Sequence, residues 1–160
     1  MSDETFHRIS DPEYAKNPRQ MLSGEGSYLY GGRWNTPGHH VVYLAQSLSL
    51  AAYEQLVHVP LKVLEPFKRI EVYVPEELIM VLDDSALGDG WNESYSKDSE
   101  AIGDQWIESG KSLALSVPSA LIPGERNILI SPGHPDFQEV TTSGVLDFNY
   151  DTRLTKIPKK

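Results

Sequence analysis

The sequence predicts a single α+β domain built from several short strands and two or three helices. Two patterns predict this class. Residues 67–75 alternate apolar and polar side chains, as a half-buried strand does, whereas residues 98–110 carry apolar side chains at a spacing of four, as a helix does. The chain has 160 residues, 39% of them hydrophobic, so one domain spanning residues 1–160 can bury its own core.

Turn residues divide the rest of the chain into short elements. The expected strands are residues 6–9, 28–30, 41–44, 67–75, 113–117, 127–130 and 145–148. One expected helix begins at Ser47 or Ser49 and ends near Val57, and the other begins at Asp98 or Ser99 and ends at Gly110. Residues 76–82 fit neither pattern, residues 13–25 are rich in turn signals, and we expect a loop over 83–96 and a frayed tail over 153–160.

Both expected helices carry acidic side chains, in different positions. Leu50, Glu54 and Val57 fall at positions i, i+4 and i+7, so we expect Glu54 on an apolar stripe. In the second helix Ile102 and Trp106 share the inner face, and a row of acidic residues is expected outside it: Glu100, Asp104 and Glu108. We interpret this acidic row as a solvated face, with a partner-binding face as the alternative.

The composition argues against several classes of protein. A net charge of −9 disfavours a nucleic-acid or anionic-membrane surface, because both surfaces favour basic patches. The absence of cysteine removes disulfides, thiolate nucleophiles and Cys-ligated zinc, and none of the five histidines lies in a metal-binding motif. No apolar run approaches the ~20 residues of a membrane helix, and the first residues lack a signal-peptide core. We therefore expect a cytoplasmic protein with no metal site.

The most informative segment is residues 24–35, Gly-Glu-Gly-Ser-Tyr-Leu-Tyr-Gly-Gly-Arg-Trp-Asn. Its four glycines allow backbone conformations that other residues avoid, and they present Arg33 beside Trp34 and Asn35. An arginine binds two phosphate oxygens at once, and the glycines allow backbone N–H groups to approach the same anion. No Gly-Lys-Ser/Thr follows, so the segment is not a Walker loop. It predicts a pocket for an anionic, planar ligand such as a nucleotide.

Four further positions are candidates for the same pocket, each with a structural alternative. Glu54 could stabilise positive charge at a ribose carbon, or could form a structural ion pair. Tyr43 could stack on a flat ring, or could belong to the core. Arg8 could contact phosphate or ribose, or could face solvent. Ser119 follows a proline and could instead cap a turn, and Ser116 competes with it for any role.

The order of these residues matches a family pattern. An early Arg8 precedes the 24–35 block, Tyr-Leu-Ala over 43–45 and the helix residue Glu54. Val-Pro-Ser over 117–119 and an Asn-x-Leu-x-x-Pro-x-His-Pro-Asp-Phe-like run over 127–137 follow, with Ser131 where Asn is more usual. This combination, over about residues 6–137, resembles the RES-domain toxins of bacterial Xre–RES type II toxin–antitoxin modules.

The resemblance implies an ADP-ribosyltransferase-like core, in which short strands form two small sheets with flanking helices and NAD⁺ binds in a cleft. It implies an NAD⁺ glycohydrolase or NAD⁺ phosphorylase that depletes cellular NAD⁺ and arrests growth, with NAD⁺ as substrate and no resident cofactor. The catalytic residues carried over by position are Arg33, Tyr43 and Glu54. The carried-over substrate-binding residues are Arg8, Gly32, Trp34, Asn35 and Ser119.

The resemblance also implies a partner, an Xre-type antitoxin with a helix-turn-helix that would cover the site. DNA would then be bound only through the antitoxin, and a homodimer within the complex is a further expectation. Two rival functions stay open, which are a protein ADP-ribosyltransferase that uses the same pocket and a non-catalytic nucleotide-binding module. The sequence does not choose between water, phosphate and a protein as the acceptor of ADP-ribose.

Overall fold

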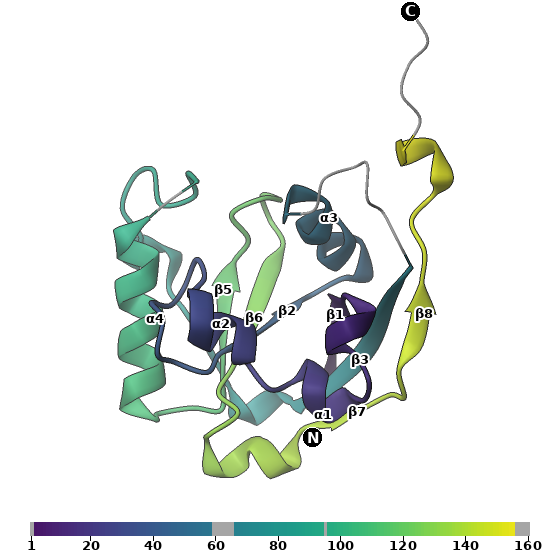
Figure 1. Ribbon diagram of the computed structural model, residues 1–160. Helices are drawn as coiled ribbons and strands as arrows, with labels where there is room; N and C mark the ends of the chain where they lie inside the picture. The colour runs from purple at the N-terminus through teal and green to yellow at the C-terminus, as the bar shows by residue number, and fades with distance from the viewer. Residues whose placement is uncertain (1, 59–65, 95, 156–160) are drawn as a thin grey trace, which may run out of the picture.

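The computed structural model describes residues 2–58, 66–94 and 96–155 and confirms the α+β class (Figure 1). Its strands are β1 (Asp3–Ser10), β2 (Val42–Ala45), β3 (Phe67–Pro75), β4 (Ile79–Val81), β5 (Ala114–Pro118), β6 (Arg126–Ile130), β7 (Thr141–Thr142) and β8 (Leu146–Phe148). Its α-helices are α1 (Pro18–Met21), α2 (Glu25–Tyr30), α3 (Leu48–His58) and α4 (Lys97–Ser109). Short 3-10 helices are η1 (Pro12–Tyr14), η3 (Glu76–Leu78), η4 (Asp84–Ala86), η5 (Pro135–Glu139) and η6 (Thr152–Thr155).

The strands form one hydrogen-bonded sheet in the order β4-β5-β6-β2-β1-β3-β7, with β8 also paired to β3. The expectation of two separate small sheets is therefore wrong. The two halves are joined only weakly, however, because β1 pairs with β2 at a single position, His7 opposite Ala45. By contrast β1 pairs with β3 along all eight of its residues. The sheet thus consists of two well-paired halves that part where β1 meets β2.

Alternate residues of the central strands pack on opposite faces of this sheet, as the two-residue period of a strand requires. Val42 and Leu44 of β2 belong to a core covered by α1, whereas Ala45 belongs to a core beneath α3. Tyr43 packs at the edge of a third cluster, which contains Trp106 of α4. Figure 1 shows α3 and α4 on either side of β5 and β6. One face of the sheet therefore carries two helices that flank Tyr43.

One predicted strand is a helix. Residues 28–30 were expected to be extended, but they form the last turn of α2. Ser27 in this helix accepts a hydrogen bond from the backbone N–H of Val41 and donates to the Val41 carbonyl, at 2.9 and 2.6 Å. These contacts dock the helix on the chain that enters β2, and they override the strand preference of two tyrosines and a leucine.

Of the ambiguous residues 76–82, 76–81 form η3 and β4, and β4 with β5 is the one parallel strand pair among the described residues. The strand expected over 6–9 is confirmed but begins three residues earlier, at Asp3, and the remaining expected strands and both expected helices are confirmed to within two residues. Of the tail expected to fray, 153–155 lie in η6 and 156–160 lie outside the described residues. Within the described parts of the chain, no helix has the length and apolar character needed to cross a bilayer.

Candidate functional site

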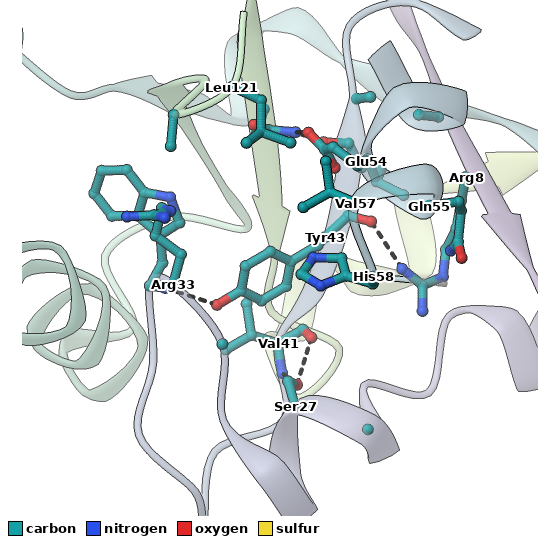
Figure 2. Close-up of a pocket in the computed structure, with 18 of the residues that line it drawn as sticks. Arg8, Ser27, Arg33, Val41, Tyr43, Glu54, Gln55, Val57, His58 and Leu121 are labelled. Carbon is teal, nitrogen blue, oxygen red and sulfur yellow. Dashed lines mark hydrogen bonds between the residues drawn. The ribbon is translucent and has the colours of Figure 1, made fainter. Parts of the chain in front are cut away.

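A cavity of about 910 Å³ opens on the helix-covered face of the sheet. Its walls come from β1, β2, β6, α2, α3, the loop 31–34, the turn 120–121 and the residues Asn92, Ser94, Ser96 and Glu100. Six of the residues predicted from the sequence line it, which are Arg8, Gly32, Arg33, Trp34, Tyr43 and Glu54. In Figure 2 the Tyr43 ring lies between Arg33 on one side and Arg8 and Glu54 on the other. The volume is that of an ordinary small-molecule site.

Tyr43 locks the loop that carries Arg33. Its hydroxyl accepts a hydrogen bond from the backbone N–H of Trp34 at 2.9 Å and donates to Asn35 Oδ1 at 2.6 Å. Gly32 permits this approach, because a Cβ there would lie 2.6 Å from the Tyr43 hydroxyl oxygen. Burial, opposed by the Trp34 N–H, raises the pKa of Tyr43 far above its ordinary value. The phenol stays neutral, so it offers the cavity a ring and no basic oxygen.

Asn35 supports the loop from inside. It is fully buried, and its amide donates to the carbonyls of Ser27 and Thr36 at 3.1 and 2.9 Å. Asn35 does not line the cavity. Its predicted role in binding substrate is therefore corrected to a structural one, because all its hydrogen bonds hold the chain around Tyr43. Gly32 and Trp34 do line the cavity, as expected.

Arg33 is held at the end of the cavity near α4. Its Nη1 donates to the Trp91 carbonyl at 2.9 Å, and its own carbonyl accepts from Ser99 Oγ at 2.8 Å. Partial burial lowers the pKa of Arg33, although an arginine remains charged under these conditions. The guanidinium is thus a fixed cation on a braced loop.

Arg8 reaches the cavity where β1 and β2 part. Its Nη1 donates to the Tyr43 carbonyl at 2.9 Å, a carbonyl that lies beyond the single β1–β2 pair. Across the same opening Gln55 Nε2 donates to the Ile9 carbonyl at 2.8 Å. Arg8 Nε is buried and has no hydrogen-bond partner within the described residues. Burial lowers the pKa of Arg8 and the nearby Glu54 carboxylate opposes this shift.

Glu54 faces the cavity from α3, as the apolar stripe predicted. Burial raises the pKa of its carboxyl, while a hydrogen bond from Asn127 and the charge of Arg8 lower it. Asn127 Nδ2 donates to Glu54 Oε1 at 2.6 Å. The alternative of a structural ion pair does not describe this residue, since no direct Glu54–Arg8 bridge forms within the described chain. An ionised carboxylate held this way can stabilise a positive charge in the cavity.

Neither late serine lines the cavity. Ser119 Oγ accepts hydrogen bonds from the backbone N–H groups of Leu121 and Ile122, each at 3.1 Å. Ser116 lies on the opposite face of the sheet, where its Oγ accepts from Arg126 Nε at 2.7 Å. The prediction of Ser119 as a substrate-binding residue is corrected in favour of its alternative, a turn-capping serine.

The acidic row on α4 is a solvated face only in part, because Glu108 is exposed whereas Glu100 and Asp104 are half-buried. Asp104 accepts hydrogen bonds from the Thr36 backbone N–H and hydroxyl, at 2.9 and 2.8 Å. Glu100 lines the cavity, and Glu108 contacts His39 Nε2 at 3.0 Å. The row packs against the loop 31–40 because Gly103, in the same helix, allows α4 to touch the Trp34 backbone.

The residues that sequence reasoning missed are polar side chains that hold strands and helices in place, chiefly Asn127 and Gln55. Asn127 carried a signal, because it is an amide next to an uninterrupted apolar run in a strand. Such a side chain needs partners on one face of the sheet.

The described residues hold no group of three or more His, Cys, Asp and Glu arranged to bind a metal.

Comparison with known proteins gives consistent matches. Residues 5–152 match the family model described as RES domain. A Toxin Res from Photorhabdus laumondii subsp. laumondii is 41% identical over 157 residues, which cover 96% of this chain and 99% of that protein. A Prs ADP-ribosylating toxin from Sphingobium sp. is 37% identical over 141 residues, which cover 84% and 87%. A chain in the crystal structure of the M. tuberculosis MbcT–MbcA toxin–antitoxin complex shares the fold, with a TM-score of 0.67, 20% identity and coverage of 92% and 85%.

Proposed function

We propose a function for this chain on the basis of its family, because the chain belongs to the RES-domain family of toxins. The chain cleaves the nicotinamide–ribose bond of NAD⁺, and the resulting loss of NAD⁺ arrests growth. The observation that carries this proposal is the convergence of Arg8, Arg33, Tyr43 and Glu54 on one cavity. Two cations suit the pyrophosphate and ribose, a neutral aromatic ring suits nicotinamide, and a carboxylate suits the cation left on the ribose.

The geometry supports a division of labour in the reaction. Arg33 and Arg8 hold the pyrophosphate or the nicotinamide ribose, and the unpartnered Nε of Arg8 is one donor for that purpose. The hydroxyl of Tyr43 is occupied by Trp34 and Asn35, so Tyr43 contributes its ring. Glu54 stabilises the ribosyl cation as the C–N bond breaks. Nicotinamide leaves as a neutral molecule, so positioning and electrostatics supply the rate without a strong acid.

A direct test compares Glu54→Gln with the wild-type protein in nicotinamide release from NAD⁺. The substitution keeps the acceptor for the Asn127 bond and removes the charge. We expect turnover to fall by about 10²–10³-fold, the size of effect typical of a lost electrostatic stabiliser. The matched control is Glu77→Gln, an exposed glutamate in η3, which should leave turnover unchanged. Full turnover by the Glu54 variant would contradict the mechanism.

A second function, transfer of ADP-ribose to a protein, is favoured by one observation. The Sphingobium relative at 37% identity is named as an ADP-ribosylating toxin. The same cavity would serve, with a protein side chain in place of water or phosphate as the acceptor. Product analysis with NAD⁺, with and without phosphate, separates the three: free ADP-ribose indicates hydrolysis, a phosphorylated product indicates phosphorolysis, and labelled protein indicates transfer.

The proposal includes an antitoxin partner of the Xre type, whose helix-turn-helix would bring DNA to the complex indirectly. The toxin–antitoxin assembly of the fold relative supports such a partner. Co-expression with a small helix-turn-helix protein encoded beside this gene should restore growth, and that protein should co-purify with the chain. Growth arrest that persists despite a stable complex would contradict inhibition at the cavity.

A further inference from the structure

Asn127 is a buried polar side chain on the cavity face of β6, and neither the sequence patterns nor the proposed function gives it a role. Its neighbours Ile128 and Ile130 pack into the core on the opposite face. Asn127 shares its face with Leu129, which packs beside Trp34. It is 8% exposed, so its amide has to find partners within the protein.

Those partners are both acceptors, which fixes the orientation of the amide. Nδ2 donates to Glu54 Oε1 at 2.6 Å and to the Leu44 carbonyl at 3.1 Å. The opposite orientation would place the amide oxygen against a carboxylate and a carbonyl, and neither group can donate when Glu54 is ionised. Both N–H groups of Asn127 are therefore used, one on the sheet and one on α3. The amide links the carboxylate of a helix to the frame of the sheet.

We propose that Asn127 is a positioning residue, which anchors one oxygen of Glu54 so that the other oxygen serves the ribosyl cation. This role rests on the proposed function for its chemistry and on the two hydrogen bonds for its geometry. Without the anchor, the Glu54 side chain has three rotatable bonds and can leave the reactive orientation. An error of about 1 Å in such a group costs about 100-fold in rate.

Asn127 also acts on the charge of Glu54. Burial raises the pKa of Glu54, and the hydrogen bond from Asn127 is the larger of the two effects that lower it, ahead of Arg8. The other titratable side chains that line this cavity near α3 are His7 from β1 and His58 of α3 itself. Because Asn127 donates to the carboxylate, it favours the ionised form that the reaction needs.

Two substitutions test this role through turnover. Asn127→Leu keeps the approximate size and removes both hydrogen bonds, whereas Asn127→Asp keeps the shape and places a second carboxyl group against Glu54. We expect kcat for NAD⁺ cleavage to fall at least 10-fold per folded molecule in both variants, with KM changed less than about threefold. We expect the acidic limb of the pH–rate profile to move to higher pH by about one unit or more. The control is Asn149→Asp, an exposed residue outside the cavity, which adds the same charge and should leave the profile in place.

A measurement without NAD⁺ separates this proposal from the proposed function. The carboxyl signal of Glu54 in labelled protein, identified by its loss in Glu54→Gln, should titrate at higher pH in Asn127→Leu than in the wild type. If the wild-type protein does not cleave NAD⁺, the proposed function fails, and the titration alone then shows whether Asn127 acts on the carboxyl group of Glu54. An unchanged Glu54 titration, or an unchanged kcat and acidic limb in folded Asn127 variants, overturns the positioning role. If Asn127→Leu fails to fold, Asn127→Asp and Asn127→Ser carry the same comparison.

Discussion

Gly103 tests whether α4 must touch the loop that carries Arg33. A Cβ at this position would lie 1.6 Å from the Trp34 carbonyl oxygen and 2.6 Å from the Trp34 carbonyl carbon. Ordinary contact begins near 3.4 Å, and the Trp34 carbonyl oxygen and carbon are backbone atoms that cannot rotate away. In Gly103→Ala the helix and the loop therefore have to separate.

The size of the effect follows from two opposing contributions. Alanine is better than glycine inside a helix by about 0.5–1 kcal/mol. Overpacking a filled interface costs about 1–3 kcal/mol, and a clash with backbone belongs at the upper end of that range. The net expectation is a loss of about 2 kcal/mol in the free energy of unfolding, or about 4–8 °C in Tm for a chain of this length.

The same substitution should reach the site. Two contacts of α4 with the loop lie on either side of Gly103, from Ser99 to the Arg33 carbonyl and from Asp104 to Thr36. Separation of the helix weakens both, so the proposed turnover of NAD⁺ should fall along with stability. Urea unfolding and nicotinamide release measure the two effects. The control for stability is Gly26→Ala in α2, where a Cβ meets nothing within 4 Å and the helix should gain up to about 1 kcal/mol. A Gly103→Ala protein as stable as the wild type would refute the reasoning.

Two other predictions concern the centre of the cavity. Tyr43→Phe keeps the ring but leaves the Trp34 N–H and the buried Asn35 Oδ1 without their partner, so the free energy of unfolding should fall by about 1–3 kcal/mol in urea titration. Tyr73→Phe, which loses only a bond to the partly exposed Glu71, should change it by less than about 0.5 kcal/mol. Burial raises the pKa of Glu54 in the folded protein, so the wild type should lose stability relative to Glu54→Gln as pH rises from the ordinary carboxyl pKa through the raised one. If the stability difference between the two proteins stays constant across this pH range, the pKa of Glu54 is not raised by folding and the reasoning fails.

The sequence was sufficient to predict the elements whose patterns are local. The alternation over β3 and the apolar spacing in α3 and α4 depend on neighbouring residues, and these elements are confirmed. The strand expected at 28–30 failed because contacts between Ser27 and Val41 decide its structure, and those residues are distant in the chain. The single sheet was also beyond local reasoning, because its halves meet at one pair only.

The site shows the same division. Arg33 and Glu54, which both line the cavity, could be singled out from the sequence because their unusual settings, a glycine-rich loop and an apolar helix stripe, are local. Asn35 and Ser119 were carried over by position as substrate-binding residues, and their hydrogen bonds inside the protein could not be predicted because these depend on the fold. Asn127 was noted only as the first residue of the 127–137 run, and its contact with Glu54 could not be predicted because the two residues lie 73 positions apart in the chain.

The opening between β1 and β2 gives these observations a common cause. A continuous ladder would place the Ile9 and Tyr43 carbonyls within the sheet, whereas here side chains of Gln55 and Arg8 satisfy them. Each of these side chains comes from an element that borders the cavity, so the parted strands admit a cation beside Glu54. Backbone pairing between β1 and β2 is lost beyond one residue pair, and the opening allows Arg8 and Glu54 to lie close together. The cavity that brings Arg8, Arg33 and Glu54 around the Tyr43 ring therefore lies where the sheet has a single β1–β2 pair, and not along its well-paired halves.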